Sequence, residues 1–162
     1  MRVVPHLLLP RAVLNRRFPP ATLEAIAAAI HASEQRHHAE IRFAIEAALD
    51  VRALWRVGTV RDRAVEVFAE LGVWSTAEHN GVLIYVLLAE RCVEIVADHG
   101  LTGRVTDAEW REVCARIERR FAAGHWRDGA LEGIEAATAL LVREFPAAGP
   151  NRNEQEDRPV VL

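Results

Sequence analysis

Hydrophobic positions near the start of the chain change from a helical spacing to strict alternation. After Pro19-Pro20, apolar residues recur every three or four positions, which predicts a helix from about residue 20 to 37. The next segment, AEIRFAIEAAL, alternates instead, and a period of two is typical of a strand. One face of this strand is apolar (Ile41, Phe43, Ile45 and Ala47), and the other is more polar (Glu40, Arg42, Ala44 and Glu46).

A second helix is predicted between Thr59 and Gly72, after a connection at residues 50–58. Thr59 suits the N-cap position because its hydroxyl can accept a hydrogen bond from an amide of the first turn. Glycine is common just past the C-terminus of a helix. The apolar stripe of this helix is predicted to consist of Ala64, Val65, Phe68 and Leu71.

The stretch HNGVLIYVLLAERCVEIVADHGL contains two apolar runs, at 82–89 and 92–98. The first is far shorter than the roughly twenty residues that span a bilayer, and it is apolar on both faces, as a buried central strand is. We expect a two-residue turn at Glu90-Arg91 that joins the runs into a hairpin. One hairpin face is then wholly apolar (Val82, Ile84, Val86, Val93, Ile95, Ala97), and the other carries Leu83, Tyr85, Leu87, Glu94, Val96 and Asp98.

The C-terminal part of the chain is predicted to be helical. Thr106 and Glu109 have the spacing of a capping box, and Gly124 ends the helix that follows. Another helix is expected from about Arg127 to Phe145. The core stripes are Trp110, Val113, Cys114, Ile117 and Phe121 in the first helix, and Leu131, Ile134, Thr138, Leu141 and Phe145 in the second, with Trp126 as a further core residue.

The order of these elements is helix, strand, helix, strand, strand, helix, helix. A strand–helix–strand unit followed by a hairpin gives a mixed sheet with helices packed on it, so the fold class is α/β. The length of 162 residues fits one domain, which we place at 20–145. Residues 1–19 are expected to be an arm that packs on the domain or, alternatively, an interfacial membrane anchor, and the polar residues 146–162 to be a disordered tail.

Composition excludes some kinds of chemistry. The net charge of −3 argues against nucleic acid as the main partner. All 20 basic residues are arginine, so neither a Schiff-base lysine nor a phosphate-loop lysine is available. The two cysteines, Cys92 and Cys114, are far apart, which fits a reducing compartment. We therefore expect a cytoplasmic location, with peripheral membrane association as a further option through the arm.

Polar residues at the ends of the hairpin strands form the candidate site. They are Glu78, His79 and Asn80 before the first strand, Asp98 and His99 after the second, and Asp107 at the start of the next helix. Because the hairpin turn lies at the far end, these groups should be neighbours. Such a cluster can supply acid–base groups or hold a cation, with Glu78, Asp98 and Asp107 as ligands. The alternative is structural: a turn at Asn80-Gly81, an Asp98 cap and solvated histidines.

A second polar cluster, Arg42, Glu46 and Glu94 together with Tyr85, is expected on the more polar face of the sheet. It is either salt-bridged packing under a helix or a buried polar pocket. The sequence Cys114–Arg120 matches the Cys-x5-Arg pattern of tyrosine phosphatases. That chemistry needs a phosphate-binding loop, whereas this cysteine falls within a predicted helix, so we exclude it.

Several of these segments resemble the TPM domain, a family named for a thylakoid-lumen protein, a photosystem II repair protein and a nematode receptor-accessory protein. The similarity is strongest in NGVLIYVLL (Asn80–Leu88). It also includes AEIRF, the strand VEIVAD, Gly100-Leu101, Val105-Thr106-Asp107 and FAAGHWRDGALEGI (Phe121–Ile134). The resemblance extends from about residue 20 to 145.

The resemblance implies an α/β/α sandwich. It also implies a family in which some members have acid-phosphatase activity, some bind divalent cations such as Ca²⁺ or Mg²⁺, and others maintain membrane complexes. The loop before Asn-Gly is typically acidic in these relatives, whereas here only Glu78 is acidic. We therefore expect a non-catalytic interaction module that binds a protein partner, either membrane-associated or another TPM protein. The alternative is a weak divalent-cation-dependent phosphatase.

Overall fold

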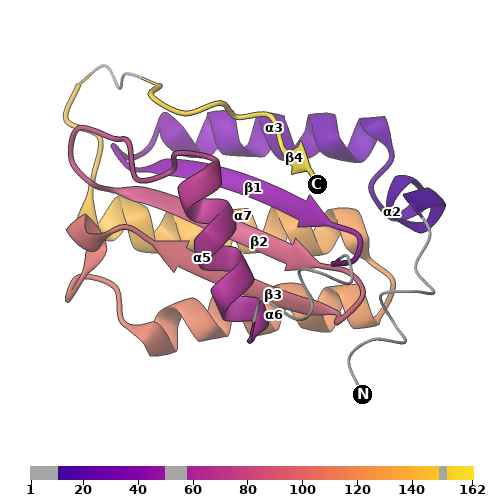
Figure 1. Cartoon of the computed structure of the whole chain (residues 1–162). Coiled ribbons are helices and arrows are strands. Elements are labelled where there is room, and N and C mark those ends of the chain that lie inside the picture. The colour runs from indigo at the N-terminus through magenta and orange to yellow at the C-terminus, as the bar shows by residue number, and fades with distance from the viewer. Residues whose placement is uncertain (1–10, 50–57, 150–152) are drawn as a thin grey trace.

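The computed structural model describes residues 11–49, 58–149 and 153–162. Most of the predicted connection at 50–58 and the first ten residues of the arm lie outside these ranges. In chain order the elements are α2 (Arg11–Arg17), α3 (Pro20–Glu34), β1 (Glu40–Glu46), α5 (Val60–Glu70), β2 (Gly81–Leu87), β3 (Cys92–Ala97), the 3₁₀ turn η1 (His99–Leu101), α6 (Asp107–Ala122), α7 (Trp126–Glu144) and β4 (Val160–Val161) (Figure 1).

The described strands form one mixed sheet of four, in the order β3-β2-β1-β4. β1 and β2 are parallel and pair along their whole lengths, and α5 connects them. β2 and β3 are antiparallel neighbours. The predicted strand–helix–strand unit followed by a hairpin is confirmed. Parallel strands need such a crossover, and the hairpin extends the sheet on its other side.

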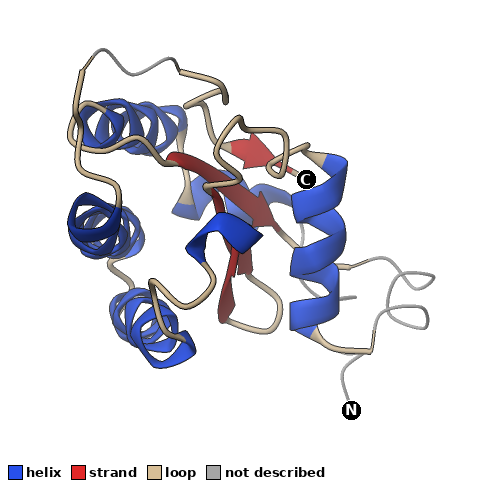
Figure 2. Cartoon of the chain, turned by 90° about the vertical axis from the view of Figure 1, so that its left-hand side faces the viewer, coloured by secondary structure: helices blue, strands red, loops and turns tan. Residues whose placement is uncertain are grey.

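Helices cover both faces of this sheet, as expected for an α/β/α sandwich. Figure 2 shows α5 on one side and the layer of α3, α6 and α7 on the other. The alternating residues Ile41, Phe43 and Ile45 of β1 enter the core on the three-helix side. Leu14 and Phe18, in and just after α2, join the same core. No helix among the described residues combines the length and apolar character needed to cross a membrane.

The hairpin has the predicted faces but a different turn. Val82, Ile84 and Val86 are opposite Ala97, Ile95 and Val93, on one apolar face. Four residues, 88–91, rather than two, separate the last strand pair, Leu87 and Cys92. The longer loop shifts the pairing by two positions, which preserves the faces because side chains alternate with a period of two. As a result, Tyr85 lies opposite Glu94.

The N-terminal cap of α5 was predicted correctly, and its apolar stripe in part: Ala64 is buried, and Phe68 and Leu71 pack partly buried against the core. Thr59 and Asp62 form a capping box, and the buried positions are Val60, Ala64 and Val67. Val65, assigned to the core from the sequence, is 47% exposed. The helix is rotated so that Arg63 also faces the sheet, and the stripe is displaced accordingly.

The expectation of a disordered tail is wrong for residues 153–162. Val160 and Val161 form β4, which pairs in parallel with Ala44 and Ile45 of β1. The amide of Leu162 then donates to the carbonyl of Ile45 at 2.9 Å. The outer edge of β1 offers unpaired backbone groups, and the short apolar end of the tail satisfies some of them. Polar composition indicated disorder because this edge is not visible in the sequence.

The contact between α6 and α7 gives a testable consequence. A Cβ atom on Gly133 would lie 2.3 Å from Cγ1 of Ile117, so Gly133→Ala should lower the free energy of unfolding by about 1–3 kcal/mol through overpacking. In an Ile117→Ala background the same change should be neutral or stabilising, by up to about 1 kcal/mol, because alanine has the higher helix propensity. Urea unfolding of the four proteins tests this. A stable Gly133→Ala single variant would contradict the close packing.

Candidate functional site

The start of β2 and the end of β3 meet, as the hairpin predicted. The amide of Asp98 donates to the carbonyl of Gly81 at 2.9 Å. Residues just before β2 and just after β3 therefore lie beside one another at one end of the sheet. This places His79, Asp98 and His99 together.

Close backbone packing holds the two loops against each other. The amide of Gly100 donates to the carbonyl of His79 at 2.9 Å. A Cβ atom on Gly100 would lie 2.5 Å from the carbonyl oxygens of both Glu78 and His79, so only glycine allows this approach. His79 itself has a φ of 52°, in the left-handed region. The relative placement of the two histidine backbones is thus fixed by the fold.

The side chains of His79 and His99 converge on one carboxylate. Nδ1 of His99 lies 3.0 Å from Oδ1 of Asp98, and Nδ1 of His79 lies 3.6 Å from Oδ2. The two imidazole centroids are 4.1 Å apart. The Asp98 side chain is 10% exposed, whereas the rings of His79 and His99 are 52% and 70% exposed. The cluster therefore consists of one largely buried carboxylate and two imidazole rings that are open to solvent.

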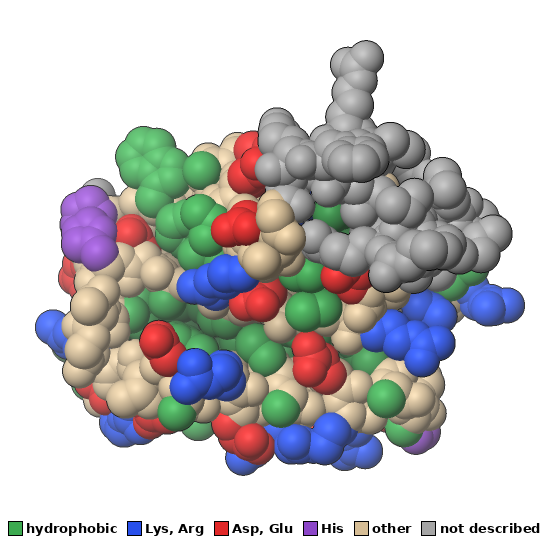
Figure 3. Space-filling view, turned by 60° about the horizontal axis from the view of Figure 1, so that its bottom comes forward, with side chains coloured by type: hydrophobic (Ala, Val, Ile, Leu, Met, Phe, Trp, Pro, Cys, Tyr) green, Lys and Arg blue, Asp and Glu red, His purple; other side chains and the backbone are tan. Residues whose placement is uncertain are grey.

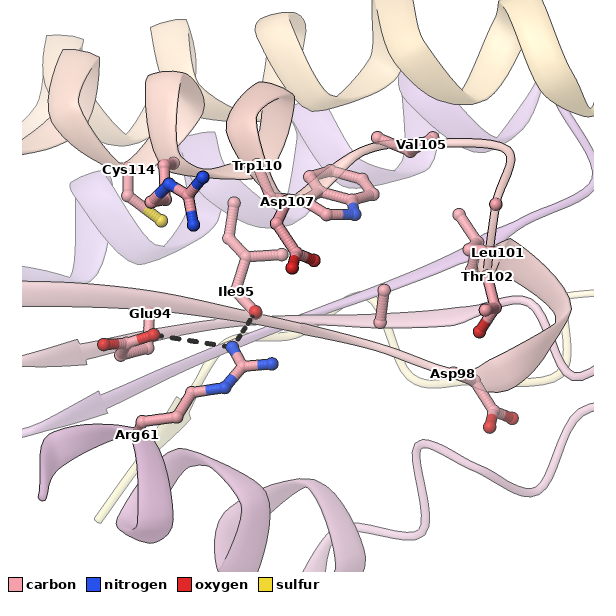
Figure 4. A pocket seen from close by; sticks show the side chains of 13 residues that line it. Arg61, Glu94, Ile95, Asp98, Leu101, Thr102, Val105, Asp107, Trp110 and Cys114 are labelled. Carbon is pink, nitrogen blue, oxygen red and sulfur yellow. Dashed lines mark hydrogen bonds and ion pairs between the residues drawn. The ribbon is translucent and has the colours of Figure 1, made fainter.

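The other predicted site residues do not join this cluster. Asn80 is buried, and its side-chain amide donates to the carbonyl of His38 at 2.7 Å, a structural role. Glu78 is exposed. Asp107 opens α6 and lines the same groove as Asp98 (Figure 4), but it is not among the residues whose ligand atoms lie close together. Among the described residues, the group whose ligand atoms lie within 4.8 Å of one another is His79, Asp98 and His99.

The expected oxygen-rich set of Glu78, Asp98 and Asp107 is therefore not assembled. Ca²⁺ takes six to eight oxygen ligands and Mg²⁺ an octahedron of oxygens. Asp98 is the sole carboxylate of the cluster described above. These residues do not fit a hard cation.

The second predicted cluster does not form one group, because Glu46, Glu94 and Arg42 each pair with a different residue. Glu46 pairs with Arg63 of α5, with its two oxygens 3.0 and 3.3 Å from Nε and Nη2, and accepts the Tyr85 hydroxyl at 2.5 Å. Glu94 pairs instead with Arg61, and Arg42 donates to the carbonyl of Glu156 in the tail. Arg63 was missed because it belongs to a helix whose rotation the sequence misjudged.

The Glu46–Arg63–Tyr85 group is structural packing under α5. Burial and the neighbouring Glu46 carboxylate raise the pKa of Tyr85 above its usual value. Burial acts to lower the pKa of Arg63, but the hydrogen bonds to Glu46 outweigh it and hold that pKa above the usual value. Arg63 is therefore charged and the phenol of Tyr85 neutral near neutral pH. These groups satisfy one another and leave no reactive side chain.

A further polar group, not predicted, lies where the tail crosses the start of β1. Glu40 is 1% exposed and accepts the Gln155 amide at 3.2 Å. Glu34 is 2% exposed and accepts the Ile41 amide at 3.0 Å. Burial raises the pKa of Glu34 to about 9 and that of Glu40 to about 7, and the carboxylate of Asp157 adds to both shifts. The sequence signal was weak, because Glu40 was assigned to the more polar face of the strand, where a glutamate is ordinary.

A groove of about 410 Å³ runs along the outer edge of β3 between α5 and α6. Figure 3 shows hydrophobic side chains in a hollow that acidic and basic side chains surround. Arg61 reaches from α5 to the carbonyl of Ile95 and to Glu94, as Figure 4 shows. Trp110 and Cys114 line the opposite wall. The groove is concave and mixed in polarity.

Neither cysteine is suited to nucleophilic catalysis. Cys114 lies within α6, as predicted, rather than on a loop. Burial raises the pKa of both Cys92 and Cys114 to about 12, so neither is a thiolate near neutral pH. The structure gives no support to a cysteine phosphatase.

Comparisons with known proteins place the chain among characterised folds. The TPM domain family profile matches residues 15–140. The NMR structure of the BA42 protein from the psychrophilic bacterium Bizionia argentinensis is 30% identical, with a TM-score of 0.77 over 88% of this chain and 93% of that one. The N-terminal domain of a P. gingivalis protein is 21% identical, with a TM-score of 0.59 over 80% and 82% of the two chains, a likeness of fold alone. No curated protein matches.

The raised pKa of the buried Glu40 carboxyl predicts how the stability of the protein depends on pH. Its pKa is about 7 in the folded chain against an ordinary 4.5, so the folded state binds the proton more tightly. The free energy of unfolding therefore loses this contribution as pH rises from about 4.5 to 7. Glutamine has no proton to lose at this position. The free energy of unfolding of Glu40→Gln, relative to that of wild type, should therefore increase by about 2 kcal/mol from pH 5 to pH 8. Urea unfolding at both values measures it.

Glu24→Gln, at an exposed position on α3, is the matched control and should show no such difference. A Glu40→Gln variant whose stability follows wild type in parallel across this pH range would contradict the raised pKa.

Proposed function

The chain belongs to the TPM domain family, and from this premise we propose that it is a non-catalytic module that binds an extended segment of a partner protein along the outer edge of β3. The observation that carries the proposal is that side chains, rather than a neighbouring strand, contact this edge. The Glu118 carboxylate accepts the amide of Val93 at 2.8 Å, and Arg61 donates to the carbonyl of Ile95.

The geometry of an antiparallel pair supports this assignment. Asp98, an even-numbered neighbour of the strand, directs its amide toward β2. Outward and inward backbone groups alternate along an edge strand, so the amides and carbonyls of Val93, Ile95 and Ala97 face the groove. An exposed edge of this kind is a site for strand addition, in which main-chain hydrogen bonds give affinity and side-chain pockets give specificity.

The walls of the groove suggest the chemistry of the partner. An added strand would turn one set of side chains toward α6, where Trp110 and Cys114 lie, and the other set toward Arg61 of α5. Apolar residues suit the first wall. Acidic residues suit the second, where they would compete with Glu94 for Arg61. We therefore infer a segment of alternating apolar and acidic residues.

A peptide titration tests the proposed binding. A capped hexapeptide of alternating Val and Glu should shift the amide resonances of Val93, Ile95 and Ala97 in ¹⁵N spectra, and the Val–Lys counterpart should bind at least tenfold more weakly. Thr102→Trp, at an exposed position that lines the groove, should abolish the shifts by filling it. Arg127→Trp, at an exposed position on α7, is the control. Equal binding of both peptides, or by Thr102→Trp, would contradict the model of recognition.

A divalent-cation-dependent phosphatase is the second candidate function. The observation in its favour is the solvent-open cluster of His79, Asp98 and His99, which offers acid–base groups at strand ends. Against it are the unassembled carboxylates and the buried cysteines.

Hydrolysis of p-nitrophenyl phosphate decides between the two functions. With Mg²⁺, Ca²⁺ or Mn²⁺ present, we expect no turnover above the protein-free rate, because the cluster found among the described residues holds one carboxylate and two imidazoles rather than the oxygen ligands such an ion takes. Turnover that is lost in Asp98→Asn but retained in His125→Ala, an exposed histidine outside the cluster, would instead establish the phosphatase.

A further inference from the structure

We propose that His79, Asp98 and His99 form a binding site for a borderline divalent transition-metal ion, with Zn²⁺ or Co²⁺ as its representatives. Asp98 also lines the end of the groove along β3, but this proposal does not depend on the proposed peptide binding. The site differs from the hard-cation set expected from the sequence, because two of its three ligands are nitrogens.

The distances are close to those of a bound ion. The ligand atoms of the three residues all lie within 4.8 Å of one another. Zinc bonds to histidine nitrogen and carboxylate oxygen are about 2.0–2.2 Å long, so the ligand atoms of a tetrahedral site are about 3.3–3.5 Å apart. Both rings are more than half exposed, and side-chain rotation of the order of 1 Å would bring them to these distances.

Asp98 gives an independent indication of a ligand. Its carboxylate is nine-tenths buried. Oδ1 accepts two donors of His99, the amide at 2.7 Å and Nδ1 at 3.0 Å. Oδ2 is buried and has no hydrogen-bond partner among the described residues, and Nδ1 of His79 lies 3.6 Å from it. An unsatisfied buried carboxylate oxygen is costly, and a cation between Oδ2 and the imidazoles would satisfy it.

The backbone fixes the arrangement before any ion binds. The two histidines lie on loops that are joined by the hydrogen bond from the Gly100 amide to the His79 carbonyl, a contact that the absence of a side chain at Gly100 allows. The backbone of His79 has a left-handed conformation. Little backbone ordering is therefore needed on binding, which favours affinity.

The donor set selects the metal. Two imidazoles and one carboxylate suit Zn²⁺, Co²⁺ or Ni²⁺, whereas Ca²⁺ and Mg²⁺ require mainly oxygen ligands. The exposed side of the rings leaves room for water to complete the coordination.

Metal titration of the chelator-treated full chain tests the site. Zn²⁺ should raise the melting temperature, as linkage requires of an ion that binds the folded state. Mg²⁺ and Ca²⁺ at the same concentration should not. Co²⁺ should produce visible d–d absorption that saturates at one equivalent, and Zn²⁺ should shift the imidazole ¹⁵N resonances of His79 and His99.

Three variants test the assignment of the ligands. His99→Ala, His79→Asn, which tolerates the left-handed backbone, and Asp98→Asn should each weaken Zn²⁺ affinity tenfold or more. His31→Ala removes an exposed histidine that pairs with Asp157 at 3.0 Å and should leave it unchanged. If Asp98→Asn does not fold, His99→Ala decides, because that ring is 70% exposed. Unchanged affinity in His99→Ala and His79→Asn, or an equal response to Mg²⁺, would overturn the proposal.

Discussion

The parallel pairing of β1 with β2 is the constraint on which the rest of the structure depends. All seven residue pairs between these strands are formed, and every residue of both strands is buried. A parallel pair needs a crossover connection, and here α5 provides it and covers one face, while α3, α6 and α7 cover the other. Once both faces are covered, polar residues in β1 can no longer face water. They must find partners inside the protein.

This requirement explains the buried charges. Glu46 is satisfied by Arg63 and the Tyr85 hydroxyl. Arg42 and Glu40 are satisfied in part by backbone groups of the tail. Removing one member of such a group leaves an uncompensated buried charge, so these residues serve the fold. The tail is for the same reason part of the domain, because it pairs with β1 and also supplies polar partners to its first residues.

The two regions that we assign to binding lie at the rim of the sheet, where the packing constraint ends. β3 is an edge strand, and its outer backbone groups face a groove between two helices. Asp98 follows directly after this strand and borders the groove as well as the two histidines. An edge strand and the loops at its end can offer polar groups outward because no further element covers them.

The sequence by itself determined the class of fold, the hairpin faces, the N-cap at Thr59 and the capping box at Thr106, because periodicity and capping are local properties. It also brought His79, Asp98 and His99 together, since the parity and direction of a hairpin follow from its two strands. Only the tertiary structure decided that Glu78 and Asp107 stay apart from this cluster, that Arg63 rather than Glu94 meets Glu46, and that the tail is ordered. Each of these depends on how a helix is rotated about its axis or on which edge of the sheet is left open, and neither quantity is encoded within a short window of the chain.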